Sequence, residues 1–182
     1  MLSTDQKGVV AETAVAHEAV RLGIEVLKPI SDGCRYDLVF HVGGVFLRIQ
    51  CKWAPRQDGV VVVRCYSARR NRDGLVRRTY GAEEVDAFAA YCPELRRCYF
   101  LPMAEFAGRV HVQLRLEPAR NNQTARVNWA EEYEFEARLS RPGAVAQLGE
   151  RLAGSQKVRG SIPLGSIPRS TPRRFKASVR KS

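Results

Sequence analysis

The sequence predicts a single α/β domain in which a mixed or antiparallel central sheet is flanked by helices. Its 182 residues, 45% of them hydrophobic, suffice for one substantial core but not for two ordinary domains. Helical periodicity near the N-terminus gives way to short strand-like segments separated by glycine-containing turns, which indicates both kinds of element. The longest apolar runs, such as residues 60–63, are too short to span a membrane, so we expect a soluble, intracellular protein with no membrane partner.

The first predicted element is a helix that begins after a cap at Ser3 or Thr4 and stops at Gly23. Glu12 lies inside this helix and shares a face with small residues, so its carboxylate can approach a neighbouring element closely. The residues that recur at helical spacing are Val9, Thr13, Ala16 and Val20.

A hairpin is predicted to follow this helix. Residues 24–30 form a short strand-like run, and residues 36–42 form a strand of mostly β-favouring residues. Gly43 and Gly44 provide a two-residue hairpin turn, and residues 45–53 form the partner strand.

The middle of the chain predicts one more strand of the same antiparallel sheet and then a projecting arm. Residues 60–68 form the strand. Residues 67–80 are polar and arginine-rich around Asp73 and Gly74, which indicates a second hairpin. Binding residues are often carried on such loops above a rigid sheet, so this hairpin is a candidate binding element.

Four further elements complete the predicted domain. Residues 82–93 are expected to form a short helix that Pro93 terminates. Residues 98–103 and 110–116 are expected to form strands, the first of them buried. A last helix is predicted within residues 121–135.

The net charge of +11 is divided unevenly along the chain. Residues 141–182 carry 10 basic side chains and one acidic side chain, whereas residues 1–140 carry 20 basic and 18 acidic ones. Overall basicity is therefore no argument for nucleic-acid binding by the folded part. Residues 48–78, with nine basic and two acidic side chains, concentrate positive charge as phosphate neutralisation requires, although an ordinary solvated hairpin would also fit.

These differences divide the chain into a folded domain, residues 1–140, and a basic tail, residues 141–182, which is predicted to be disordered. Within the tail, residues 143–166 resemble a bacterial tRNA gene translated in its sense direction. One codon run that encodes AVAQLGER spells a D-arm, one that encodes GSIP spells a T-arm, and the 24 codons span roughly one tRNA with the arms in the correct order. We therefore expect the reading frame to lie beside or inside a tRNA locus.

The five cysteines and three histidines show no metal-ligand spacing, since the sequence contains no CxxC motif and no histidine pair. A structural zinc site is therefore not predicted. We expect the cysteines to be reduced packing residues, although the sequence leaves a single disulfide open.

An ordered set of polar residues carries the strongest functional signal. Glu12 lies in the first helix, Asp37 in YDLVF, and Gln50 and Lys52 in RIQCKW. This order of helix carboxylate, strand aspartate, hairpin and x-K resembles the PD-(D/E)xK nuclease signature. The resemblance implies a restriction-endonuclease-like core with a projecting basic hairpin.

Gln50 departs from the general signature, because it stands where a second acidic residue is usual. With YDLV, RIQCKW and a helix carrying KGxxAE, the chain is more similar to a subgroup of group I intron-encoded homing endonucleases in which this glutamine belongs to the active site. The similarity covers roughly residues 5–105, including YCPE and CYFLP.

The resemblance implies roles for these residues that agree with their chemistry. Asp37, the Gln50 amide oxygen and the Cys51 backbone carbonyl would bind Mg²⁺ or another divalent metal such as Mn²⁺. Lys52 shares a strand face with Gln50 and would orient the attacking water or stabilise developing charge. Glu12 would hold the metal through water or position Lys52. Each residue type alone is usually a solvated surface residue, so the prediction depends on their ordered context.

Double-stranded DNA is the implied partner, bound by a homo-oligomer, a tetramer or a dimer, in the bacterial cytoplasm and on the nucleoid. The candidate DNA-contacting residues are basic or hydroxyl side chains near the predicted site and in the arginine-rich hairpin: Lys7, Arg35, Ser67, Arg69, Arg70, Arg72, Arg77 and Arg78.

Two alternatives remain open at the level of sequence. A structure-selective enzyme of the same fold, such as a Holliday-junction resolvase, would use the same Glu12, Asp37 and Lys52. A DNA-binding protein that kept the scaffold but lost catalysis would explain Gln50 as a lesion.

Overall fold

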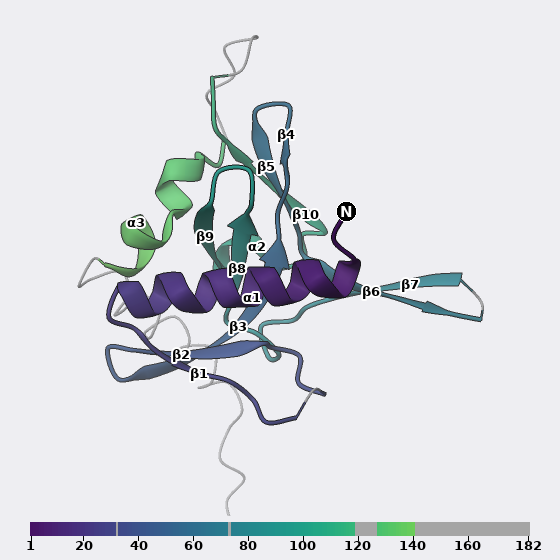
Figure 1. Cartoon of the computed structure of the whole chain (residues 1–182), viewed down its shortest axis with the longest axis horizontal. Helices are drawn as coiled ribbons and strands as arrows, with labels where there is room; N and C mark the ends of the chain where they lie inside the picture. Colours follow the sequence, from purple (N-terminus) through teal and green to yellow (C-terminus); the bar gives the residue numbers. More distant parts are fainter. Residues whose placement is uncertain (32, 73, 119–126, 141–182) are drawn as a thin grey trace, which may run out of the picture.

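A computed structural model describes residues 1–31, 33–72, 74–118 and 127–140 (Figure 1). The predicted tail, residues 141–182, lies outside the described residues, as does its tRNA-like segment, residues 143–166. The elements, in chain order, are α1 (Thr4–Arg21), β1 (Glu25–Leu27), β2 (Leu38–Val42), β3 (Val45–Trp53), β4 (Arg56–Gln57), β5 (Val60–Arg64), β6 (Tyr66–Asn71), β7 (Gly74–Thr79), β8 (Ala87–Cys92), β9 (Arg97–Pro102), α2 (Met103–Phe106), β10 (His111–Arg115), the 3-10 turn η1 (Ala130–Tyr133) and α3 (Phe135–Leu139).

Helix α1 begins and ends as predicted. Ser3 is the N-cap, and a capping box joins it to Gln6: the Gln6 N–H donates to Ser3 Oγ at 3.2 Å, and the Ser3 N–H donates to Gln6 Oε1 at 2.9 Å. After Arg21 the chain turns at Gly23, whose φ of 76° suits glycine. In the described part of the chain, no helix is long and apolar enough to cross a membrane.

The buried face of α1 is not the predicted stripe. Ala11, Val15 and Ala19 are buried, whereas Val9 and Val20 are 62% and 61% exposed. Both stripes have helical spacing, so periodicity alone could not choose between them. The stripe with two alanines faces the sheet because α1 packs directly against β3 and β8, where small side chains permit a close approach.

The main sheet has five strands in the order β1-β2-β3-β8-β9. Residues 45–53 form β3, as predicted, and pair with β2 through the Gly43-Gly44 turn. Both glycines have positive φ, 58° and 81°, as a type I′ hairpin turn requires. All neighbouring strands are antiparallel except β3 and β8, which run parallel. The mixed character expected of this sheet is thus confirmed.

The helix predicted at residues 82–93 is wrong, because this segment contains β8, an interior strand of the main sheet. Ala87 and Ala89 pack into the core on the α1 side, whereas Phe88 and Ala90 pack into the core on the opposite side. A parallel strand that is buried on both faces lacks the alternation of a half-exposed strand. Its alanine-rich run therefore resembled a helix in the sequence.

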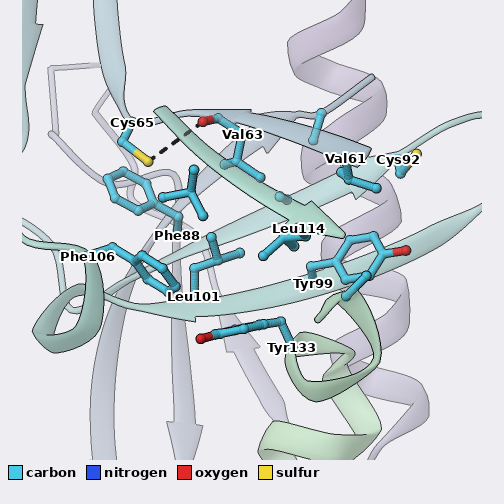
Figure 2. Close-up of a cluster of buried hydrophobic side chains, with 14 of the residues drawn as sticks. Val61, Val63, Cys65, Phe88, Cys92, Tyr99, Leu101, Phe106, Leu114 and Tyr133 are labelled. Atoms are coloured by element: carbon cyan, nitrogen blue, oxygen red, sulfur yellow. Dashed lines mark hydrogen bonds between the residues drawn. The ribbon is translucent and has the colours of Figure 1, made fainter. Parts of the chain in front are cut away.

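A second correction concerns residues 60–68, which do not join the main sheet. Strand β5 pairs with β10 and β4 in a separate three-stranded sheet. The predicted strands at 98–103 and 110–116 are confirmed as β9 and β10. Figure 2 shows the core between the two sheets, where Val61, Val63 and Leu114 pack with Phe88 and Leu101.

The predicted second hairpin is confirmed as β6 and β7, a two-stranded sheet that extends away from the rest of the domain (Figure 1). We call this two-stranded sheet the arm. Of the segment 121–135, in which a last helix was predicted, residues 121–126 lie outside the described residues, and the remainder contains the short turn η1 and the first residue of α3. Phe135 anchors α3 through edge contacts with Phe40 and Phe100. All five cysteines are free, and four of them are buried, which agrees with their predicted role in packing.

Candidate active site

Asp37 lies immediately before β2 and turns its carboxylate toward β3. Its N–H donates to the Ile49 carbonyl at 2.8 Å, so the backbone continues the pairing of the two strands. Its Oδ2 accepts the Cys51 N–H at 2.7 Å and also accepts from the Gln50 side-chain amide. The hairpin predicted from Gly43-Gly44 thus brings residue 37 beside residues 50 and 51.

Gln50 connects the groups predicted to bind a metal. Its side chain is buried, with 9% exposed, and its Nε2 contacts both Asp37 Oδ2 and, at 3.3 Å, the Cys51 carbonyl. One amide nitrogen therefore lies between two oxygen acceptors. Within the described ranges, no three or more His, Cys, Asp and Glu side chains form a group that could hold a metal ion. The candidate set at this position combines one carboxylate with an amide and a peptide oxygen.

Burial makes the Asp37 carboxylate unusually basic. Burial raises the pKa of Asp37 to about 6, the Cys51 N–H hydrogen bond opposes this rise, and the negative charge of Glu12 adds to it. The positive charge of Lys52 lowers the pKa slightly. Such a carboxylate gains from a nearby cation, because a cation compensates for the lost solvation of its charged form.

Lys52 is held from β3 by two oxygen acceptors. Its Nζ donates to the Tyr66 carbonyl and to the Tyr80 hydroxyl, both at 3.1 Å, and lies 4.5 Å from the centre of the Tyr80 ring. Burial lowers the pKa of Lys52 to about 8, an effect that the negative charge of Asp37 opposes. Lys52 and Asp37 are thus electrostatically coupled, although no ion pair within 4 Å joins them among the described residues.

Glu12 approaches the site from α1 but does not contact Lys52. Its Oε2 pairs with Lys28 Nζ at 2.9 Å, and its predicted roles, holding the metal through water or positioning Lys52, stay predictions. Glu12 raises the pKa of Asp37, and Lys28 lowers it, so both charges act on the site. Sequence reasoning missed Lys28 because it follows β1, in a segment with no recognisable motif.

Comparison with known proteins identifies the family. A family model described as PD-(D/E)XK endonuclease matches residues 2–136. The chain belongs to the PD-(D/E)XK endonuclease family. The solved structure of a bacterial homing endonuclease, I-Ssp6803I, is similar with a TM-score of 0.62 and 28% sequence identity, over 86% of this chain and 99% of that chain. No curated protein matches the chain significantly.

The arm of this PD-(D/E)XK endonuclease presents several of the predicted DNA-contacting residues. Arg69, Arg72, Arg77 and Arg78 are exposed, and Arg70 lies in β6. Arg77 stacks over the Tyr66 ring at 5.1 Å, and Arg78 pairs with Glu84. Lys7 lies in α1, with its Nζ 5.8 Å from the centre of the Trp53 ring.

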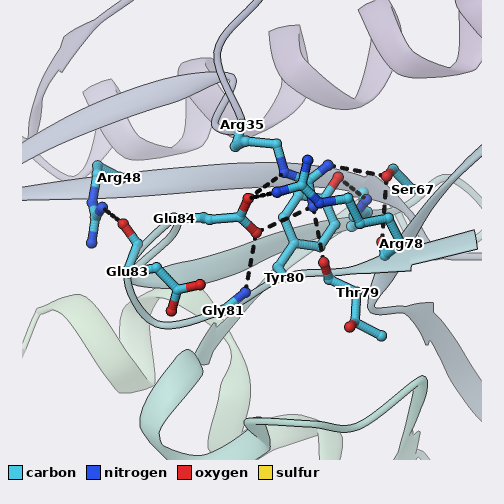
Figure 3. Close-up of polar contacts among 10 residues, drawn as sticks. Arg35, Arg48, Ser67, Arg78, Thr79, Tyr80, Gly81, Glu83 and Glu84 are labelled. Carbon is cyan, nitrogen blue, oxygen red and sulfur yellow. Dashed lines mark hydrogen bonds and ion pairs between the residues drawn. The ribbon is translucent and has the colours of Figure 1, made fainter.

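Two of the residues predicted to contact DNA, Arg35 and Ser67, also make hydrogen bonds within the protein. Arg35 donates to Glu84 Oε1 at 3.0 Å, to Ser67 Oγ at 3.1 Å and to the Thr79 carbonyl at 2.9 Å (Figure 3). Its guanidinium also lies over the Tyr80 ring at 4.0 Å. Arg35 and Ser67 therefore fasten the base of the arm to the domain, and their predicted contact with DNA stays a prediction.

Tyr80 and Glu84, like Lys28, were not predicted from the sequence. Glu84 accepts from Arg35, Arg78 and the Gly81 N–H, and Tyr80 contacts both Arg35 and Lys52. Glu84 lay within the segment that was predicted to be a helix, where an acidic residue is unremarkable. The position of Tyr80 could have drawn attention to it, because it is the aromatic residue that ends the arginine-rich segment 67–80.

Proposed function

We propose that this endonuclease is a site-specific homing enzyme that hydrolyses both strands of duplex DNA at a tRNA-gene target, with Mg²⁺ or Mn²⁺ as its cofactor. The observation that carries the proposal is the convergence of Asp37, Gln50 and the Cys51 carbonyl close to Lys52, at the base of an exposed basic arm. The similarity to a bacterial homing endonuclease supports the same activity.

The groups that meet at Gln50 fit a hard divalent cation. Asp37, Gln50 and the Cys51 carbonyl would hold it, because a half-turn of the Gln50 amide replaces its nitrogen by its oxygen at the same place. A bound divalent ion would polarise the scissile phosphate and lower the pKa of a water molecule. The high pKa of Asp37 favours this arrangement, since the carboxylate lacks a cation within ion-pair distance among the described residues.

Lys52 supplies the positive charge that the reaction needs beside these ligands. Its ammonium can orient the attacking water and stabilise the charge that develops on the phosphate. Because burial lowers its pKa to about 8, the group is predominantly charged at pH 7. Glu12 acts on the site from a longer distance: its negative charge raises the pKa of Asp37, and the charge of its partner Lys28 lowers that pKa.

The resemblance of residues 143–166 to a translated tRNA gene supports a tRNA gene as the cleavage target. Residues 143–166 resemble a translated tRNA gene with its D-arm and T-arm in order, which supports a reading frame that lies beside or inside a tRNA gene. An enzyme encoded in a group I intron would cut the intronless allele of that gene. Cleavage of both strands calls for two active sites, which a homodimer or a homotetramer supplies by symmetry.

The test is cleavage of linear duplexes that carry the fused tRNA exons, beside four-way junctions of the same sequence. We expect a double-strand cut in the duplex that needs Mg²⁺ or Mn²⁺ and is stopped by a chelator. The variant Lys52→Met should lose about 10³-fold in rate and still bind the duplex. Preferential junction cleavage would favour the resolvase alternative, and binding without cutting would favour the inactive one.

The exposed arginines of the arm should contribute to DNA affinity through phosphate neutralisation. Each of Arg69→Ala, Arg72→Ala and Arg77→Ala is expected to reduce the slope of log affinity against log salt by about 0.9, if each side chain meets one phosphate. Fluorescence anisotropy in Ca²⁺ between 50 and 200 mM salt, roughly, measures this slope. Arg21→Ala is the control, because Arg21 lies in α1 and pairs with Glu18 and Glu136. The salt dependence of DNA affinity in Arg21→Ala should equal that of the wild type.

A further inference from the structure

The chain enters the arm at one tyrosine, Tyr66, and leaves it at another, Tyr80. Strand β6 begins at Tyr66, strand β7 ends at Thr79, and Tyr80 follows directly. Tyr66 pairs with Thr79 in the first register position of the hairpin, so Tyr66 and Tyr80 lie at its two roots. Any displacement of the arm relative to the domain must be transmitted through these roots.

The two hydrogen bonds of Lys52 end at these same roots. One runs to the Tyr66 carbonyl, where β6 begins, and the other to the Tyr80 hydroxyl, just after β7. The ammonium is therefore held by the arm and not by Asp37, since no ion pair joins Lys52 to Asp37 in the part of the chain that the structure describes. Where the arm lies thus determines where the ammonium lies.

The Tyr80 ring is fixed on two sides. Arg35 stacks on its face at 4.0 Å, and Phe88 meets it edge-on at 5.5 Å between ring centres. Arg35 is held in turn by Glu84 and by the Thr79 carbonyl, which belongs to the arm (Figure 3). The hydroxyl of Tyr80 is consequently aimed at Lys52 by a rigid framework that includes the root of β7.

We propose that Tyr80 is a positioning residue for Lys52 and that it couples seating of the β6–β7 arm on DNA to the cleavage step. The inference rests on the proposed function, because it takes Lys52 as the catalytic ammonium and the arm as a DNA contact. When the arm seats on a duplex, its roots fix the Tyr80 hydroxyl and the Tyr66 carbonyl, and these set the place of the ammonium. Correct DNA contact then stabilises the position of Lys52 that these two hydrogen bonds define.

The first test is Tyr80→Phe, which keeps the ring and removes only the hydroxyl. The matched control is Tyr133→Phe: Tyr133 is 6% exposed against 7% for Tyr80, and its hydroxyl also makes a 3.1 Å bond to a charged partner, Glu105. Single-turnover cleavage at saturating duplex should fall about tenfold or more in Tyr80→Phe, while DNA affinity measured in Ca²⁺ stays within about twofold. Tyr133→Phe should match the wild type in both measurements.

A cleavage rate of Tyr80→Phe within about twofold of the wild type overturns the inference, as does an equal loss of rate in Tyr133→Phe. Lys52→Met separates this failure from failure of the proposed function. If Lys52→Met is inactive and Tyr80→Phe cuts normally, only the positioning role is wrong. If Lys52→Met itself cuts normally, the assignment of Lys52 to catalysis is wrong.

The second test addresses the coupling itself with a double-mutant cycle. Arg69→Ala, on the exposed part of the arm, should slow cleavage at saturating duplex in the wild type but add little to the loss already present in Tyr80→Phe. Such non-additivity means that the arm acts on the cleavage step through Tyr80. Additive losses of rate, or a loss of affinity with no change of rate, overturn the coupling.

Discussion

Replacement of Asp37 by asparagine is expected to slow DNA cleavage by about 10³-fold or more and, at the same time, to raise the free energy of unfolding at neutral pH. The loss of activity follows from removing the charged oxygen that the proposed cation binds. The gain in stability follows from the pKa of about 6, which exceeds the ordinary value of 3.8 because the carboxylate is buried.

The pH dependence of this gain has a definite sign. Between pH 3.8 and about 6 the folded protein binds more protons at Asp37 than the unfolded chain does, so the stability of the wild type falls as pH rises through this window. Above the window the ionised carboxylate costs roughly 1–3 kcal/mol, which Asp37→Asn removes. The difference should shrink toward zero near pH 4.

Urea unfolding of the metal-free protein at pH 7.5 and at pH 4 measures this difference. The control is Glu131→Gln, an exposed carboxylate whose removal should change stability by no more than about 0.5 kcal/mol. An Asp37→Asn variant less stable than the wild type at pH 7.5 would show that the buried carboxylate stabilises the metal-free fold.

Loss of Arg48 is expected to have the largest effect on stability. Asp86 is buried immediately before β8, and its carboxylate accepts the Arg48 N–H at 2.7 Å, Arg48 Nε at 3.0 Å and Arg48 Nη2 at 2.8 Å. The guanidinium also donates to the Ala82 carbonyl at 3.0 Å and to the Glu83 carbonyl. Arg48 thus fixes the segment that leads into the parallel strand beside β3.

Arg48→Ala should lower the free energy of unfolding by about 3–5 kcal/mol, because it leaves the Asp86 carboxylate buried without its charged partner. Arg56→Ala is the control, since its pair with Glu117 is exposed and should contribute about 1 kcal/mol or less. Chemical denaturation followed by circular dichroism measures both. Equal losses in the two variants would mean that Asp86 finds water or another partner when Arg48 is absent.

The features predicted best from the sequence are those that a short stretch of chain determines, such as turns, helix caps and hairpins. The Gly43-Gly44 turn placed β2 and β3 in register, and that register alone brings Asp37 beside Gln50 and Cys51. The capping residue of α1 and the β6–β7 hairpin were predicted for the same reason, since a short stretch of sequence determines each. The family was predicted from the resemblance that Glu12, Asp37, Gln50 and Lys52 carry in their order along the chain, and the family model confirms it.

What the sequence could not predict depends on distant parts of the chain. β8 is an interior strand because β3 and β9 cover its edges and two cores cover its faces, and none of these neighbours adjoins it in sequence except β9. The partners of Lys52 and Arg35 are set by where the arm joins the domain. The internal partners of Arg35 and Ser67 could therefore not be predicted from the sequence.

The arm is a sheet of its own, which has a consequence for how new cleavage specificities could arise. No strand of β6–β7 pairs with either larger sheet, so the outer part, from Arg69 to Val76, can be exchanged without disturbing a neighbouring strand. Only the inner positions next to Tyr66 and Tyr80 must be retained. Under the proposed role of the arm in DNA binding, sequence drift or deliberate grafting in that outer part would retarget the enzyme to another locus while its chemistry stays intact.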